Sequence, residues 1–129
     1  MTGNSCLLDT SIIIHSFRNN EYAKQALSKF DQLYVNSVVC GELYYGAYFS
    51  TNPQKHIKQI EAFLINCSII HVTAETSVIY GQVKSELRKK GTPIPENDIW
   101  IAASAIEHGI PLFTNDNHFK LMQLNLILL

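Results

Sequence analysis

Four acidic residues could act together in chemistry, because each lies where an apolar segment ends or where a helix begins. They are Asp9, Glu42, Asp98 and Asp116. Asp9 and Asp116 each follow a short apolar run that is typical of a buried parallel strand. Glu42 and Asp98 each fall in the first turn or so of an expected helix. Because these positions share the edge of a parallel sheet where ligands bind, we expect the four carboxylates to converge.

Neighbouring carboxylates raise one another's pKa values unless a cation lies among them. Oxygen-only ligands on a rigid frame favour Mg²⁺ or Mn²⁺ over zinc. None of the five histidines has a zinc-ligand spacing; His118 could reach the site from two residues after Asp116, but a surface position is favoured. Such an ion suits phosphodiester hydrolysis, because it activates a water and stabilises the phosphorane. Neutral groups that could hold the water or the phosphate are Thr10, Ser11, Thr114 and Asn115.

Each acid also has a purely structural explanation when it is taken alone. Asp9 could simply cap the helix that follows it. Glu42 lies in an apolar segment, where a buried carboxylate would need a cation or hydrogen bonds, but its side chain could instead reach solvent or pair with a lysine. A chemical role therefore requires the four acids to meet at one place.

The chain has 129 residues, 47% of them hydrophobic and 16% charged, which predicts a single domain over residues 1–129 and hints at a covering partner. A net charge of −1 argues against binding nucleic acid by bulk charge, although the basic run at residues 88–90 could contact RNA phosphate if it does not merely complement a helix dipole. We expect no membrane span, no signal peptide in residues 1–5 and a cytoplasmic location. The three cysteines are expected to be buried, reduced thiols.

The apolar and turn patterns predict alternating strands and helices. Strands are expected over residues 6–8, 33–35, 68–72, 111–113 and 124–129, and helices over 12–17, 21–31, 38–49, 53–65, 74–90 and 99–107. This order predicts an α/β fold with a mostly parallel central sheet and helices on both faces. The helix over 38–49 is apolar or aromatic at nearly every position, so it is either buried on most sides or partly covered by another chain.

Four segments resemble the four motifs of PIN-domain ribonucleases. They read LLDTS (residues 7–11), CGELYYG (40–46), PENDIWIAA (95–103) and LFTNDNHF (112–119). The short length and the Glu-Leu-x-x-Gly pattern are most similar to the VapC toxins of bacterial toxin–antitoxin pairs. The resemblance covers essentially the whole chain. It implies a PIN-like domain and a metal-dependent endoribonuclease that cleaves RNA and is held inactive by a small antitoxin protein.

Carried over by position, the resemblance makes Asp9, Glu42, Asp98 and Asp116 the acids that bind Mg²⁺ or Mn²⁺, with Thr114 as a supporting hydroxyl. Asp116 is the least secure of these, because its motif varies in the family and the fourth acid can be replaced. The resemblance also implies a homodimer with a groove for an antitoxin segment. The aromatic side chains of residues 43–49 could line that groove, and packing in the core is the alternative for each of them.

Three other classes of protein are alternatives for these residues. A phosphoacceptor receiver domain would have adjacent acids after the first strand and a lysine after the last one, and a haloacid-dehalogenase phosphatase would have Asp-x-Asp. Here Asp9 is followed by Thr10 and Ser11, which fits neither class. A catalytically silent PIN-like module that acts by binding an antitoxin stays open, but it would leave four converging acids without a purpose.

Overall fold

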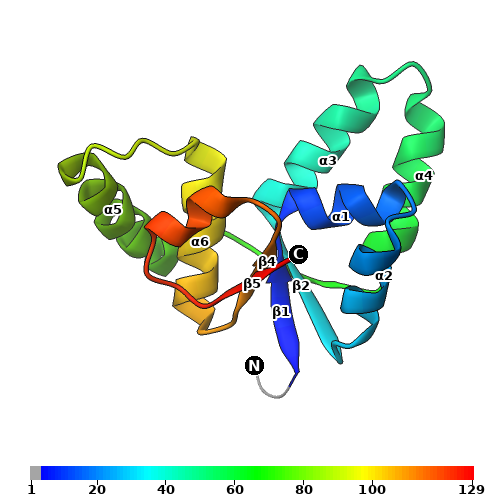
Figure 1. Cartoon of the computed structure of the whole chain (residues 1–129). Coiled ribbons are helices and arrows are strands. Elements are labelled where there is room, and N and C mark those ends of the chain that lie inside the picture. The colour runs from blue at the N-terminus through cyan, green and yellow to red at the C-terminus, as the bar shows by residue number, and fades with distance from the viewer. Residues whose placement is uncertain (1–3) are drawn as a thin grey trace.

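The computed structural model describes residues 4–129 as an α/β fold around a five-stranded sheet (Figure 1). The strands are β1 (Ser5–Leu8), β2 (Gln32–Asn36), β3 (Ser68–Ile70), β4 (Leu112–Thr114) and β5 (Leu126–Leu128). The helices are α1 (Thr10–Phe17), α2 (Glu21–Ser28), α3 (Ser37–Phe49), α4 (Pro53–Leu64), α5 (Ala74–Lys89) and α6 (Glu96–His108), with a 3₁₀ turn, η1 (Asn117–Leu121). The predictions of no signal peptide in residues 1–5 and of a domain over residues 1–129 include residues 1–3, which lie outside the described residues.

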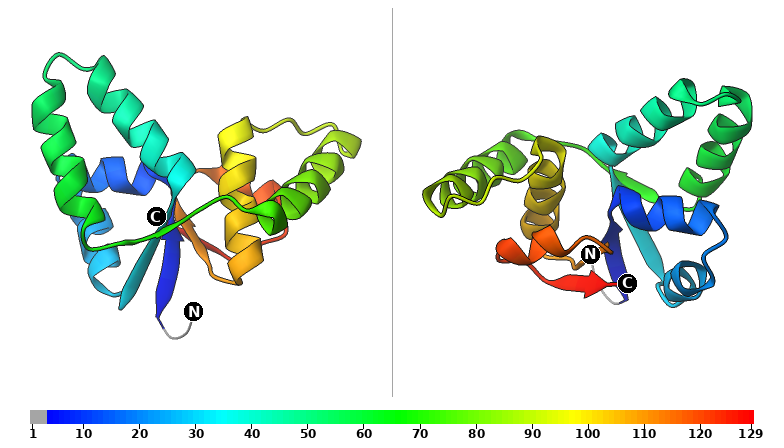
Figure 2. Two further views of the ribbon diagram at one scale, coloured as in Figure 1. Left: turned by 180° about the vertical axis from the view of Figure 1, so that it is seen from behind. Right: turned by 45° about the horizontal axis from the view of Figure 1, so that its top comes forward.

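All strand pairs in the sheet are parallel, and their order is β3-β2-β1-β4-β5. β1 lies at the centre and all four of its residues are buried, as the continuous apolar run predicts. Helices α1 to α4 lie on one side of the sheet, and α5, α6 and η1 lie on the other (Figures 1 and 2). The predicted α/β fold with a parallel sheet and helices on both faces is therefore confirmed.

Local sequence signals set several of the element ends. Asn36 ends β2 and caps α3, since its side-chain oxygen accepts from the Val38 N–H at 2.7 Å. The same side chain is fully buried and its amide donates to the Ser104 hydroxyl of α6, which ties the two faces of the sheet together. Gly109 ends α6 at φ 63°, a left-handed conformation that a residue without Cβ adopts at little cost.

Several element boundaries differ from the prediction by one to three residues. β3 ends at Ile70, because the chain then leaves the sheet and His71 and Val72 are exposed. α2 ends at Ser28, three residues early, because the next two backbone N–H groups bond to carbonyls only three residues back and tighten the last turn. α6 begins at Glu96, three residues before the predicted start, and Asp98 lies in its first turn, as predicted.

The helix α3 divides its apolar residues between the core and the surface. Val39, Leu43 and Ala47 are buried in the core. Tyr45, Tyr48 and Phe49, which we call the α3 aromatic patch, are 69%, 66% and 80% exposed, and the rings of Tyr45 and Phe49 stack at 5.8 Å between centroids. The α3 aromatic patch is therefore free in this chain to contact a partner.

The predicted burial of the cysteines is confirmed for one of the three. Cys6 is buried, and Cys40 and Cys67 are half-buried; all three are free. Burial raises the pKa of Cys6 to about 12 and that of Cys67 to about 11, so neither forms a thiolate near neutral pH. Among the described residues, no helix is both long enough and apolar enough to cross a bilayer.

Candidate active site

The predicted acids gather where the direction of the sheet connections reverses. From β1 the chain moves to β2 and β3 on one side, while β4 and β5 extend the sheet on the other side. In open parallel sheets, such a switch point opens a crevice beyond the carboxyl ends of the two central strands. Asp9 directly follows β1, and Asp116 lies two residues after β4, so both lie beyond the carboxyl ends of the central strands.

Asp9 is held by three hydrogen bonds on its carboxylate and is 5% exposed. Oδ1 accepts from the Thr10 backbone N–H at 2.9 Å, so Asp9 caps α1, as its structural explanation predicted. Oδ2 accepts from the hydroxyls of Ser11 at 2.9 Å and Thr114 at 2.7 Å. Hydrogen bonds from three donors fix the orientation of this buried carboxylate. Capping and a place in the site are thus compatible for this residue.

Glu42 reaches the same region from the second turn of α3. Its Oε1 accepts from the Thr10 hydroxyl at 2.8 Å, and the residue is half-buried. Thr10 therefore links the two acids, since its backbone N–H binds Asp9 and its side chain binds Glu42. Glu42 is neither paired with a lysine nor directed to solvent, which were the two structural explanations for it.

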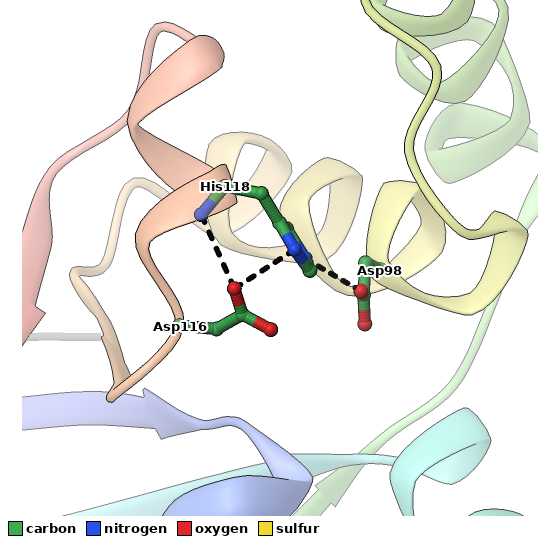
Figure 3. Close-up of side chains that lie close together, drawn as sticks. All are labelled: Asp98, Asp116 and His118. Carbon is green, nitrogen blue, oxygen red and sulfur yellow. Dashed lines mark hydrogen bonds and ion pairs between the residues drawn. The ribbon is translucent and has the colours of Figure 1, made fainter.

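Asp98, Asp116 and His118 form the most compact group in the site (Figure 3). The imidazole of His118 lies between the two acids, with Nε2 at 2.7 Å from Asp98 Oδ2 and Nδ1 at 2.8 Å from Asp116 Oδ1. Asp116 Oδ1 also accepts from the His118 backbone N–H at 3.2 Å and so caps η1. The expectation of a surface position for His118 is wrong, because the turn of η1 directs the ring inward; its side chain is only 28% exposed.

Thr114 joins this group to Asp9. Its hydroxyl donates to Asp9 Oδ2 and accepts from the Asp116 N–H at 3.0 Å, and the residue is fully buried. A continuous hydrogen-bonded network therefore runs from Glu42 through Thr10, Asp9 and Thr114 to Asp116, and through His118 to Asp98. Its members come from β4, η1 and three helices, and they lie up to about a hundred residues apart in the chain.

The electrostatics of the site are those of crowded negative charge. Burial raises the pKa of Asp98 to about 6; the charge of Asp9 raises it as well, His118 opposes the rise and Glu42 adds to it. Asp98 is therefore close enough to both Asp9 and Glu42 for their charges to affect its pKa. Within residues 4–129, however, the only three ligand-type residues whose atoms lie within 4.8 Å of one another are Asp98, Asp116 and His118. Asp9 and Glu42 lie outside that group.

Comparison with known proteins agrees with the fold. The sequence profile described as "PIN domain" matches residues 6–123. The chain belongs to the PIN-domain family. Its relatives include ribonuclease VapC2 of Haemophilus influenzae, 38% identical over 114 residues and 85% of both chains, and ribonuclease VapC2 of Rickettsia felis, 33% identical over 130 residues, 95% of this chain and 94% of the other.

Solved structures of the same PIN group superpose closely on this chain. VapBC2 of Rickettsia felis, bound to a DNA fragment from its promoter, has a TM-score of 0.86 at 29% identity and covers 95% of this chain and 97% of its own. VapBC-1 of nontypeable Haemophilus influenzae also gives 0.86, at 27% identity, and covers 96% and 97%. The predicted resemblance to VapC-type PIN domains is therefore confirmed.

Proposed function

We propose that this PIN domain is an endoribonuclease that requires Mg²⁺ or Mn²⁺ and serves as the toxin of a type II toxin–antitoxin pair. The observation that carries the proposal is the network of four carboxylates at the switch point of a PIN fold. Relatives that are 33–38% identical over most of the chain are ribonucleases by name, which supports the same class of reaction here.

In this proposal Asp9, Glu42, Asp98 and Asp116 hold the divalent ion. The donor set fits a hard cation, since it offers carboxylate oxygens from four separate points of the chain. The raised pKa of Asp98 supports the same view, because excess negative charge in a half-buried site is relieved by a cation. The ion pairs that the described residues make with Asp98 and Asp116 involve only His118, which leaves most of this charge uncompensated.

A bound divalent ion would supply positive charge that makes water more acidic and stabilises the phosphorane and the departing oxygen. The protein contributes orientation. Thr114 and Ser11 fix Asp9 Oδ2 by donating to it, and Thr10 fixes Glu42. Because these hydroxyls sit on β4 and the first turn of α1, beside a fully buried strand, the carboxylates are held rigidly before RNA binds.

The partners in this proposal are an RNA substrate, a cognate antitoxin protein and a second copy of the chain. The α3 aromatic patch supports a protein partner, because three large exposed side chains on one helix are unusual for an isolated domain. Solved relatives of this fold are VapBC complexes, which supports an antitoxin as one such partner. A cytoplasmic location follows from a role in cleaving cellular RNA.

The decisive experiment is RNA cleavage by the purified chain with Mg²⁺ or Mn²⁺, with chelator, and with the variant Asp9→Asn. Cleavage that stops on chelation and falls at least a hundredfold in Asp9→Asn is expected. The control Asp31→Asn removes an exposed acid outside the network and should cut like wild type. A folded wild-type chain that cuts no RNA but still binds its antitoxin would instead be the catalytically silent module.

A further inference from the structure

One face of the helix α2 lines a cavity that the proposed chemistry does not use. Tyr22, Gln25, Ala26 and Lys29 have the i, i+3, i+4 and i+7 spacing that places residues on one side of a helix, and all four line the cavity. The opposite face of α2 is buried in the core. The cavity, which we call the α2 cavity, has a volume of about 530 Å³, within the range of pockets that hold small organic ligands.

Other walls of the α2 cavity are joined to the network of acids by hydrogen bonds. Asn115 and Leu129 belong to these walls. The Asn115 backbone N–H lies 3.5 Å from the Ser11 hydroxyl, which donates to Asp9 Oδ2. The Leu129 N–H donates to the Thr114 carbonyl at 3.0 Å, and the Thr114 hydroxyl donates to the same Asp9 oxygen. A ligand in the α2 cavity would therefore lie beside the acids, in a position that the fold holds fixed.

The side chains of the α2 cavity are of the kinds that bind an unpaired nucleic-acid base. Tyr22 is 79% exposed, so the face of its ring is accessible for a base to stack on. Gln25 and Lys29 are exposed as well. An amide offers both a donor and an acceptor to the edge of a base, and an ammonium suits the phosphate that adjoins it. None of the described side chains that line the α2 cavity is acidic, in contrast to the neighbouring network.

We propose that the α2 cavity binds the unpaired RNA base next to the phosphate that is cut, with Tyr22 stacking on the base and Gln25 hydrogen-bonding to its edge. This inference rests on the proposed function, because it places the base beside the carboxylates that would hold the ion. It goes further by assigning the sequence preference at the cut to α2 and not to the acids. An RNA base is favoured over a protein segment because the cavity combines an aromatic ring, an amide and a cation directly beside the acids that would act on RNA.

The first test measures stacking of a base and does not depend on cleavage. The probe is a short single-stranded RNA with the fluorescent base 2-aminopurine at each position in turn, bound to the Asp98→Asn chain, which lacks one of the proposed metal ligands. At one position the fluorescence should fall on binding, because a base that stacks on Tyr22 is quenched. Tyr22→Ala in the same background should restore the fluorescence and weaken RNA binding about 5- to 150-fold. Tyr22→Phe is the matched control, since it keeps the ring and should quench as before.

The second test determines the cleavage sites of the wild-type chain in a pool of single-stranded RNA of random sequence, with Mn²⁺. Wild type should prefer particular bases next to the cut, and Gln25→Ala should reduce that preference by about fivefold or more. Gln54→Ala removes an exposed amide on α4 that does not line the α2 cavity, so it should leave the preference unchanged. Both variants change exposed helical positions to alanine, which helices tolerate well.

Quenching that persists in Tyr22→Ala overturns the proposal. Cleavage by wild type without any base preference, or an unchanged preference in Gln25→Ala, overturns it as well. A Tyr22→Ala chain that cuts RNA like wild type but escapes inhibition by its antitoxin would assign the α2 cavity to a protein segment, which also overturns it. Quenching that depends on Tyr22, in a protein whose wild type cuts no RNA, supports the base site and removes the nuclease, whereas cleavage without such quenching removes only the base site.

Discussion

Replacing Asp98 by Asn should stabilise the metal-free protein, because it removes an acid that is costly to ionise in the folded state. The pKa of Asp98 is about 6 in the structure against an ordinary value of 3.8, a rise of roughly two pKa units on folding. At 1.36 kcal/mol per unit this amounts to roughly 3 kcal/mol above pH 7, an upper limit for the gain in Asp98→Asn. For a domain of this size the melting temperature should rise by up to about 10 °C.

The sign of the pH dependence follows from the raised pKa. Between pH 3.8 and about 6 the folded chain retains a proton on Asp98 that the unfolded chain has lost, so wild-type stability falls as pH rises through this window. The gain from Asp98→Asn should therefore be full above pH 7, fall to about half at pH 5 and vanish below the ordinary pKa. Thermal unfolding at several pH values, with chelator present, measures this directly.

A bound divalent metal ion should make the wild-type chain more stable than Asp98→Asn. Mn²⁺ binds the folded wild type and stabilises it by about 2.7 kcal/mol at a hundred times its dissociation constant, whereas the variant has lost a ligand and gains less. Asp31→Asn is the control for charge, since it removes one exposed acid far from the site and should change stability by less than about 0.5 kcal/mol. If Asp98→Asn and wild type have the same melting temperature at pH 7.5 in chelator, ionised Asp98 does not destabilise the fold and the explanation is wrong.

Two further substitutions test how the site and its frame are held. Thr114→Val keeps the buried volume but leaves the Asp116 N–H unpaired and removes a donor from Asp9. Urea unfolding should therefore show a loss of stability of about 1–3 kcal/mol, which Thr114→Ser avoids because it keeps the hydroxyl. Equal stability in the Val and Ser variants would contradict the hydrogen bonds described. Gly109→Ala should cost about 1 kcal/mol of stability because φ is 63°, whereas Gly81→Ala within α5 should be neutral or stabilising. At both positions the added Cβ meets nothing within 4 Å, so only the backbone conformation differs. Changes in stability of the same sign for the two variants would refute the conformational explanation.

Local patterns in the sequence were sufficient to predict the fold class. The apolar run that became β1 acts over a few neighbouring residues. The caps at Asn36 and Thr73 and the left-handed Gly109 at the end of α6 are equally local signals. Once the strands are parallel, their carboxyl ends must share an edge. The approach of Asp9 to Thr114 and Asp116 therefore followed from the order of elements.

Only the tertiary structure decided how the acids are grouped. Asp98 and His118 are separated by twenty residues, and their contact depends on how η1 turns after β4 and how α6 packs beside it. The two-residue spacing between Asp116 and His118 was visible in the sequence, yet a spacing does not fix the direction of a side chain in a turn. Which side chains meet at the site is set by packing among distant elements, and that information is not contained in any local stretch of the chain.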